Sequence, residues 1–477
     1  MWSGRFREPL HPDFEQWQRS LSFDWRLLPQ EIAASKAHAR MIAAAGILSG
    51  RELEAILSAL DSIAAEFAAR PPADIWNRAE AEDVHHFVEL ELQSRIGDTG
   101  LKLHTGRSRN EQIATDLRLY VREQGGLLAG RLAAWSRALA AQAARAGEDT
   151  MPAYTHLQRA EPVLVAHWLL AYSEMLLRDI ARLNDGAARL NCCPLGSGAV
   201  AGATLRLDRA LAAADLGFRA PTANSMDATG DRDFVLEFLH ALTLIALHAS
   251  RFAEEITLFA TAEFGFVDLP ESFSTGSSAM PQKKNPDFAE LARAKAARIE
   301  GAAQAAAMLL KGLPLAYNKD LQEMQIPLFT ATEESLRLAE LLAAFTAALR
   351  FNRERMRAAC ETGYLNAMAA ATYLVHKGLP FRKAHEKIGQ AVRYGIERRR
   401  ELNELTLEEL RQFDSGFEAD FFSSITPEAT VNCHDVIGGT AAARVRQALA
   451  EHEDRLLAAL GQKAMGQNAI GWNSGNS

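Results

Sequence analysis

The chain has 477 residues, of which 48% are hydrophobic and 23% are charged, and its formal net charge is −8. This composition is typical of a soluble globular protein of two or three domains, and it excludes disordered and fibrous classes. The negative net charge provides no broad basic surface for nucleic acid or for an anionic membrane, so an anionic ligand must meet a local cluster of positive charge.

Residues 1 to about 105 predict mixed short helices with loops at "RPPADIW" and "GDTGLKLHTG". The start, "MWSGRFREPLHPDF", lacks the apolar run of a signal peptide, so no targeting segment is expected. The four cysteines, of which Cys192 and Cys193 are adjacent, fit neither a disulfide framework nor a zinc-ligand spacing. We therefore expect a reducing, cytoplasmic setting.

Residues 106 to about 355 predict long helices. In "EESLRLAELLAAFTAALRF" leucine or phenylalanine recurs at the three-and-four spacing of one buried helix face. From Asp233 to about Glu263 no glycine or proline occurs, and the first half is apolar around nearly the whole circumference. This pattern predicts contacts on every side at the centre of a bundle, because the most apolar stretch is too short to span a bilayer. Alternating strand patterns are absent, so any sheet is expected to be minor.

The remaining residues, with "KGLPFRKAHEKIG" and "VIGGTAAA", predict a smaller helical domain. The expected fold is therefore all-α with three mostly helical domains. These are an N-terminal domain (1–105), a central helix bundle (106–355) and a C-terminal domain (356–477).

The first of three polar clusters is "LHTGRSRNEQ", residues 103–112, which precedes a long helix expected to start near Glu111. Backbone amides, hydroxyls and a guanidinium at a helix N-terminus form a good receptor for a carboxylate or a phosphate. The alternative is a simple helix cap with a surface arginine.

The second cluster is "YTHLQRAEP", residues 154–162, just ahead of Pro162 and another expected helix, where the histidine could also be purely structural. The third is "STGSSAMPQKKNPDFAEL", residues 274–291, which combines a glycine, small hydroxyls and two lysines before a helix opened by Asn-Pro. Such a stretch is too polar for a core and its charge is too compact for an ordinary solvated face, so a flexible polar loop is the weaker interpretation.

Two further patterns are less favourable. "GSGAVAG", residues 196–202, lacks the spacing of a dinucleotide-binding loop, and a glycine loop that packs helices is the better interpretation. His85, His86 and Glu89 could face a metal from one helical turn, but no H-E-x-x-H motif occurs and no second ligand set is visible. No metal is expected.

Taken together, the three clusters resemble the three signature regions of the fumarase/aspartase superfamily, most closely those of its argininosuccinate lyase family, to which the delta-crystallins are related. "GSSAMPQKKNP" has the Gln-Lys-Lys form of that family, and "KLHTGRSRN", "YTHLQRAEP", "PLGSGAVAG", "DRDFVLEFL" and "YNKDLQE" are similar to its other motifs in order and spacing. The resemblance extends from "WSGRF" to "GGTA", which is essentially the whole chain.

The resemblance implies a cofactor-free anti elimination that splits argininosuccinate into arginine and fumarate. Loss of the proton next to a carboxylate creates a dianion, which must meet fixed positive charge and aimed hydrogen-bond donors. The resemblance also implies a homotetramer in which the central helices form a common core and each active site draws the three regions from three subunits.

The resemblance assigns Ser277 as the general base and His156 as the acid toward the departing nitrogen, with Glu290 making His156 more basic. Lys283 and Asn285 would meet the dianion, helped by the helix that opens at Pro286. The substrate-binding residues that it implies are Ser20, Asp24, Ser108, Arg109, Asn110, Thr155, Tyr317, Lys319 and Gln322, with His85 behind those that touch the substrate.

The chain departs from the family pattern in two motifs. The family commonly continues "YNKDLQE" with Asp-Lys-Glu-Pro, whereas this chain reads Met324, Gln325, Ile326 and Pro327. Gln325 stands where the family commonly has a lysine that would meet a substrate carboxylate, and Glu111 replaces the usual aspartate. Substrate identity is therefore less constrained than reaction type, and a lyase acting on another N-substituted succinate is an alternative. A catalytically weakened structural relative, as in lens crystallins, is a second, which the retained Ser277 and His156 disfavour.

Overall fold

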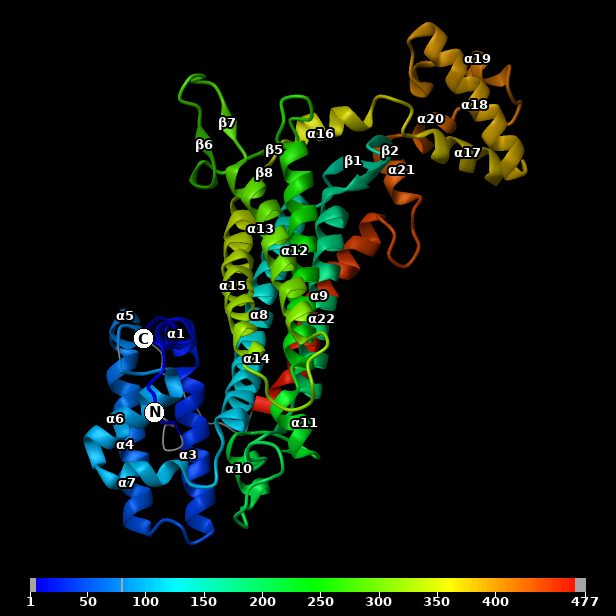
Figure 1. The fold of residues 1–477 in the computed structure, drawn as a ribbon. Coiled ribbons are helices and arrows are strands. Elements are labelled where there is room, and N and C mark those ends of the chain that lie inside the picture. The colour runs from blue at the N-terminus through cyan, green and yellow to red at the C-terminus, as the bar shows by residue number, and fades with distance from the viewer. Residues whose placement is uncertain (1–5, 79, 468–477) are drawn as a thin grey trace.

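The computed structural model describes residues 6–78 and 80–467, which are built mainly of helices (Figure 1). The N-terminal region is a compact group of helices beside one end of a long bundle (Figure 1). Its elements are α1 (Pro12–Trp17), α2 (Leu21–Asp24), η1 (Trp25–Leu27), α3 (Leu28–Ala44), α4 (Gly50–Ala68), α5 (Ala73–Trp76), α6 (Val84–Ile96), α7 (Asp98–Leu101) and η2 (Lys102–His104).

Helix α4 shows how the sequence specifies these elements. The Glu52 amide donates to Ser49 Oγ at 3.3 Å and the Ser49 amide donates to Glu52 Oε2 at 2.8 Å, so this capping box satisfies two backbone donors at the helix start. Ile56, Leu60 and Ile63 then follow at three-and-four spacing and are fully buried.

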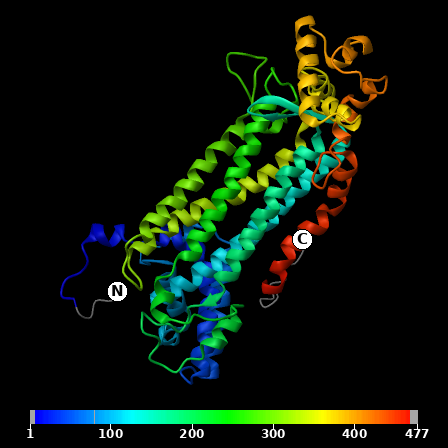
Figure 2. The same ribbon diagram turned by 90° about the vertical axis from the view of Figure 1, so that its right-hand side faces the viewer.

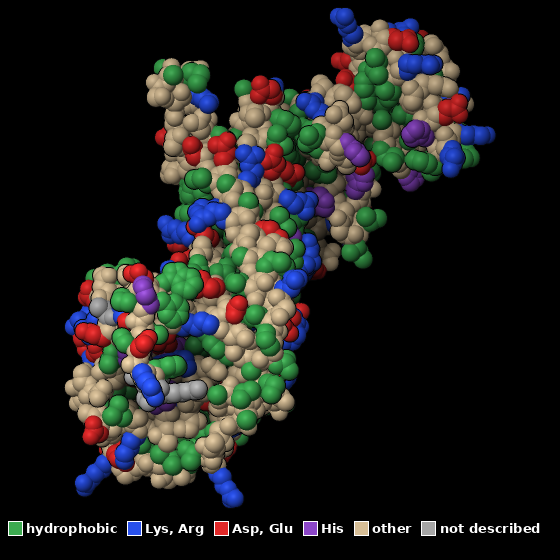
Figure 3. All heavy atoms as spheres, viewed as in Figure 1, with side chains coloured by type: hydrophobic (Ala, Val, Ile, Leu, Met, Phe, Trp, Pro, Cys, Tyr) green, Lys and Arg blue, Asp and Glu red, His purple; other side chains and the backbone are tan. Residues whose placement is uncertain are grey.

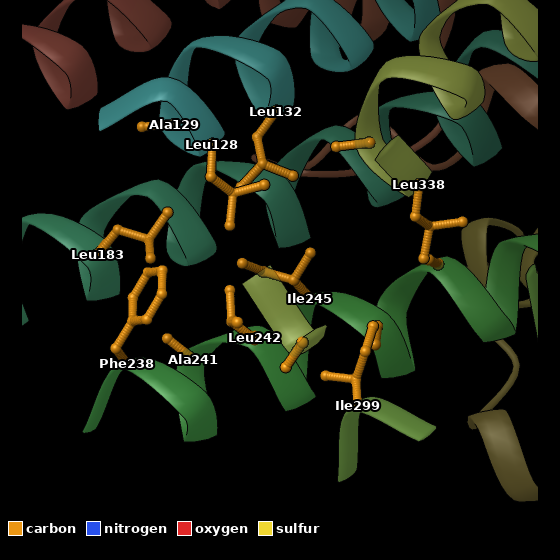
Figure 4. Close-up of a cluster of buried hydrophobic side chains, with 14 of the residues drawn as sticks. Leu128, Ala129, Leu132, Leu183, Phe238, Ala241, Leu242, Ile245, Ile299 and Leu338 are labelled. Atoms are coloured by element: carbon orange, nitrogen blue, oxygen red, sulfur yellow. The ribbon is translucent and has the colours of Figure 1, made fainter. Parts of the chain in front are cut away.

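Five long helices run alongside one another in the bundle (Figures 1 and 2). They are α8 (Arg109–Ala146), α9 (Val165–Arg189), α12 (Asp233–Phe259), α13 (Asp287–Leu310) and α15 (Gln325–Ala348). Figure 4 shows their buried side chains meeting, with Leu132 of α8, Leu183 of α9, Ile245 of α12, Ile299 of α13 and Leu338 of α15 among them. The all-α prediction is confirmed.

Helix α12 is the one described helix that is long and apolar enough to cross a membrane by length and composition. Its position explains that apolarity, because it packs against α8, α9, α13 and α15 inside the bundle. The expected contacts on every side are only partly present within one chain, since Leu247 is 48% exposed.

Sheets are minor among the described residues, as expected. The antiparallel pairs are β1 (Thr150–Thr155) with β2 (Gln158–Leu164), β5 (Val267–Asp268) with β8 (Arg350–Phe351), and β6 (Thr275–Gly276) with β7 (Lys284–Asn285); β3 (Cys192–Cys193) and β4 (Ala220–Pro221) are parallel. Short connecting helices are α10 (Arg209–Asp215), α11 (Ser225–Gly230), η3 (Glu271–Phe273) and α14 (Asp320–Glu323).

The β1–β2 hairpin corrects one expectation. A helix was expected from Pro162, with His156 at its start, but Pro162 lies in β2 and helix α9 begins only at Val165. His156 and Leu157 form a two-residue turn with φ angles of 56° and 57°. Two successive positive φ values match the twist of a tight hairpin, and this local geometry prevails over the helical pattern.

The C-terminal part has its own hydrophobic cluster, which includes Tyr373, Ile388, Phe417 and Phe421. Its elements are α16 (Arg353–Cys360), α17 (Ala367–His376), α18 (Phe381–Arg398), η4 (Leu402–Glu404), α19 (Leu407–Arg411), α20 (Phe421–Ser424) and α21 (Pro427–Asn432). The last helix, α22 (Ala442–Gln467), returns along the bundle and packs against α8 and α9 (Figure 2).

Candidate active site

The N-terminus of α8 is fixed by a glutamate. The Ser108 amide donates to Glu111 Oε1 at 3.0 Å, and the Gly198 amide donates to Glu111 Oε2 at 2.8 Å. The Asn110 side chain donates to the Ala199 carbonyl at 3.2 Å. The glycine loop at 196–202 therefore holds this helix start in place, which agrees with its packing interpretation, and α8 begins two residues before the expected Glu111.

Arg109 is the first residue of α8, and its guanidinium is held by acidic neighbours. Its Nε lies 3.2 Å from Asp83 Oδ2, and its Nη1 lies 3.6 Å from Glu89 Oε1. The Nη1 group also donates to Gln112 Oε1 at 3.1 Å. Burial opposes the charge, but Asp83 and Glu89 outweigh it and raise the pKa of Arg109. The group is a fixed cation.

A cavity of about 370 Å³ lies against this helix start. Eight of the predicted residues are grouped in or directly behind its wall. The cavity is lined by Ser20, Glu82, Asp83, His104, Arg107, Ser108, Arg109, Ile113, Tyr317, Lys319, Gln322 and Gln325, and Asp24 and His85 are buried behind it.

One wall of the cavity is acidic. Ser20 donates to Asp24 Oδ2 at 2.6 Å, and the Val84 amide donates to Asp24 Oδ1 at 3.0 Å. Burial, followed by the charge of Asp83, raises the pKa of Asp24 to about 7. Asp24 can therefore change its charge near neutral pH, directly behind the cavity wall.

Another part of the wall comes from the loop after α13, from α14 and from the start of α15. Burial raises the pKa of Tyr317 to about 12, so its hydroxyl stays a donor. Lys319 pairs with Glu82 at 3.2 Å, and Gln322 donates to the Gln18 carbonyl at 3.0 Å. Gln325 is 2% exposed, and its Oε1 has no hydrogen-bond partner. The cavity thus offers both signs of charge and an unused acceptor to a polar ligand.

The segments that carry the predicted catalytic residues, and Thr155 of the predicted binding residues, lie at the far end of the bundle (Figure 1). Thr155 and His156 are exposed at the tip of the β1–β2 hairpin. Ser277 lies in the projecting β6–β7 hairpin, where its hydroxyl accepts hydrogen bonds from the Ala279 and Met280 amides at 3.2 and 3.1 Å. Two amide donors favour a negative charge on that oxygen, as a serine base requires.

The remainder of this hairpin is tied together internally. The Asn285 side chain donates to the Gly276 carbonyl at 3.3 Å, and Lys284 pairs with Asp268 at 2.9 Å, while Lys283 is exposed. Helix α13 then begins at Asp287 directly after Pro286, as predicted, and Glu290 in its first turn lies 3.9 Å from Arg293.

Within one chain these two groups of residues cannot meet. Helix α8 has 38 residues between Arg109 and the segment that leads to His156, which corresponds to about 57 Å of helix. Helix α13 separates the Ser277 hairpin from Tyr317 by 24 residues, or about 36 Å. Figure 3 shows the hairpin projecting from the bundle, above a face on which acidic and basic side chains are intermixed.

The sequence did not single out several residues that the fold brings to the cavity or directly behind it. Arg107 lines it and has two nitrogen atoms, Nε and Nη2, without a partner. Gln112 and Asp116 lie three and seven positions after Arg109, so helical spacing alone could have placed them on its face. Glu31 comes from α3, and no local pattern indicates it.

The sequence offered His85, His86 and Glu89 as possible metal ligands, but the structure does not bring these three side chains together. His86 Nδ1 accepts the Glu82 amide, and Glu89 pairs with His104 at 2.9 Å, so neither joins His85. His85 instead meets Glu31 and Asp116, whose candidate ligand atoms lie within 4.8 Å of one another.

Comparisons with known proteins identify the family. Residues 4–301 match the model of a lyase family, and residues 364–432 match that of the argininosuccinate lyase C-terminal family. The chain is 66% identical to an argininosuccinate lyase of Acidobacterium capsulatum over 94% of this chain and 93% of that protein, and 54% identical to one of Koribacter versatilis over 96% and 98%. The structure of an EDDS lyase variant with bound fumarate aligns with a TM-score of 0.82 at 25% identity, over 97% of this chain and 93% of that one.

The fold and the match to the lyase family model define a lyase of the fumarase/aspartase superfamily. Within this superfamily, the chain belongs to the argininosuccinate lyase family.

Proposed function

We propose that this chain cleaves argininosuccinate to L-arginine and fumarate by a cofactor-free anti elimination in the cytoplasm. The observation that carries the proposal is the cavity in which the start of α8, with Ser108 and Arg109, faces Tyr317 and Gln322. Carboxylates fit the helix start and its guanidinium, while the acidic wall and the polar side chains suit an amino-acid end.

In this mechanism Ser108, Arg109, Asn110 and Thr155 hold the succinate carboxylates, and Ser20, Asp24, Tyr317, Lys319 and Gln322 hold the arginine portion. His85 supports the cavity wall from behind.

Ser277 removes the proton next to a carboxylate. The resulting dianion is met by Lys283, Asn285 and the N-terminus of α13, while His156, supported by Glu290, gives a proton to the departing guanidino nitrogen. The two amides on the Ser277 oxygen support its role, since they stabilise the alkoxide that a base must form.

The separation of these groups along α8 and α13 supports a homotetramer with shared sites. A second copy could bring its β6–β7 hairpin, and a third its β1–β2 hairpin, to the cavity of the first. Leu291 and Met308 of α13, which are 59% and 62% exposed, together with Leu247 of α12, are candidates for such an interface.

The decisive experiment incubates the purified chain with argininosuccinate, adenylosuccinate, aspartate and malate and follows the ultraviolet absorbance of fumarate. Release of fumarate mainly from argininosuccinate supports the proposal. If no substrate releases fumarate, the chain is a catalytically weakened structural relative of the lyases. Release mainly from another N-substituted succinate is the second candidate function, which is favoured by Gln325 on the cavity wall, whose Oε1 has no hydrogen-bond partner.

A further inference from the structure

Behind Arg109, three side chains from three helices meet in the interior. Glu31 of α3, His85 of α6 and Asp116 of α8 are each at most 1% exposed. His85 Nδ1 lies 2.8 Å from Glu31 Oε2 and 3.4 Å from Asp116 Oδ2. A ring nitrogen has one hydrogen to donate, and the shorter distance directs it to Glu31.

The two carboxyl groups differ in their other contacts. Glu31 accepts hydrogen bonds from Ser35 Oγ at 2.5 Å and from Gln112 Nε2 at 2.7 Å, and Arg107 lies 4.0 Å away. Neither oxygen of Asp116 has a hydrogen-bond partner. A buried carboxylate without donors is costly, whereas one supplied with donors and a nearby cation is tolerated. The negative charge therefore belongs on Glu31 and the proton on Asp116.

The electrostatics of the surroundings agree with this distribution. Burial and then the charge of Glu31 raise the pKa of Asp116, against the opposing effect of Arg107 and Arg109. Burial also disfavours a charge on Glu31, but His85 and Arg107 outweigh it and lower the pKa of Glu31. The charged or titratable groups around the cluster are Asp24 on α2, Glu31 and His38 on α3, His85 on α6, Arg107 before α8 and Arg109 on α8.

Gln112 connects this cluster to the cavity. Its Nε2 donates to Glu31 and its Oε1 accepts from Arg109 Nη1. A side-chain amide has an NH₂ group that donates and an oxygen that accepts. When Glu31 is an anion it attracts the NH₂ group of Gln112, so the Gln112 oxygen is left facing Arg109.

We propose that Glu31 and Asp116 hold a single proton between them, and that Gln112 transmits this arrangement to the guanidinium of Arg109. Glu31, Gln112 and Asp116 are then positioning residues, since they touch Arg109 or each other and not the reacting atoms. The proposal rests on the proposed function, in which Arg109 receives a carboxylate of the substrate.

The first test replaces Asp116 with its permanently neutral isostere, Asp116→Asn. In the unfolded chain the pKa of Asp116 is about 3.9, so above that pH the unfolded chain has lost the proton that the folded protein still holds. The stability of the wild type therefore falls as pH rises above about 3.9. The variant lacks this contribution. Its Tm should therefore decline less than that of the wild type as pH rises, a readout that needs no substrate.

The same variant gives a kinetic readout. Loss of the Asp116 proton at alkaline pH would place two adjacent anions beside Gln112, so the wild-type KM should rise there, and this rise should be absent in Asp116→Asn. An equal pH dependence of Tm in the two proteins would overturn the shared proton.

The second test uses Gln112→Met to break the hydrogen bonds that link Glu31 to Arg109. Methionine keeps the length and burial of the side chain but has neither the donor nor the acceptor of the amide. KM should rise about tenfold, as expected for the loss of a hydrogen bond to a charged group. The matched control is Gln142→Met, a buried glutamine of the same helix that donates to the Thr346 and Leu349 carbonyls. It should lower Tm and leave KM unchanged. Equal KM values for both variants would refute the connection.

Two different measurements test the proposed function and the shared proton. Fumarate release tests the function, whereas the Tm profiles and metal binding test the shared proton. If the wild-type chain releases no fumarate from any substrate, the proposed function fails, while the Tm profiles still decide the shared proton. If Co²⁺ or Mn²⁺ raises the Tm of the wild type saturably and does not raise that of Asp116→Asn, the carboxyl pair holds a cation and the proposal is wrong.

Discussion

Gln325 gives the sharpest prediction, because one buried atom determines opposite effects on stability and on binding. Its Oε1 is unpartnered and the residue is 2% exposed. A buried unsatisfied carbonyl costs about 1–3 kcal/mol. The change Gln325→Met removes that cost, so Tm should rise by about 1 °C for each kcal/mol recovered, because the unfolding entropy grows with chain length and this chain has 477 residues. KM should rise at the same time, because the substrate loses a polar partner in the cavity.

Gln325→Lys should have the opposite effects, lowering both Tm and KM. A lysine in this buried position lacks water, so the free enzyme should lose stability. A substrate carboxylate would complete the charge-assisted hydrogen bond, worth about 1.5–3 kcal/mol, so KM should fall by about tenfold or more. The contact is equal in the ground and transition states, so kcat should change little.

Steady-state kinetics with argininosuccinate at fixed ionic strength, together with thermal denaturation, measure both effects. Gln142→Met again serves as a control, since that amide is hydrogen-bonded and lies outside the cavity. A KM that is unchanged or raised in Gln325→Lys would refute the reasoning, and would favour a substrate other than argininosuccinate.

Three other predictions follow from the site. Ser277→Ala should lower turnover at least about 100-fold while the chain stays folded and binds substrate, and turnover above about a tenth of wild type would exclude it as the base. Tetramers of inactive His156→Asn mixed with inactive Ser277→Ala should regain fumarate release after subunit exchange, whereas no recovery in hybrids confirmed by mass would place both residues on one chain. The folded chain binds the Asp24 proton up to a pH of about 7, so its stability should fall from about pH 4 to that value, and Asp24→Asn should flatten this part of the Tm profile.

The sequence was sufficient for features that depend on local spacing. The apolar repeat through Leu338 and Leu342 predicted a helix with one buried face, and both residues are buried in α15. Motifs such as "GSSAMPQKKNP" indicated the family, which the comparisons confirmed. The division into domains at residues 105 and 355, and the roles of the site residues, stay predictions.

Local spacing failed where a tight turn competed with a helix. Nothing in "YTHLQRAEP" showed that His156 and Leu157 would adopt positive φ and close a hairpin. The turn is stabilised by pairing of β1 with β2, and pairing between strands is not visible in a helical periodicity.

Only the tertiary structure decided which residues share a cavity. Gln325 follows Arg109 by more than 200 positions, yet both residues line the cavity. Glu31 precedes Arg109 by 78 positions, yet it lies directly behind the cavity, where it accepts a hydrogen bond from Gln112. Periodicity specifies which face of each helix is buried, because neighbours three and four positions apart lie on one side. It does not specify which helices pack together or in what register, since that depends on how all the side chains fill the space between them.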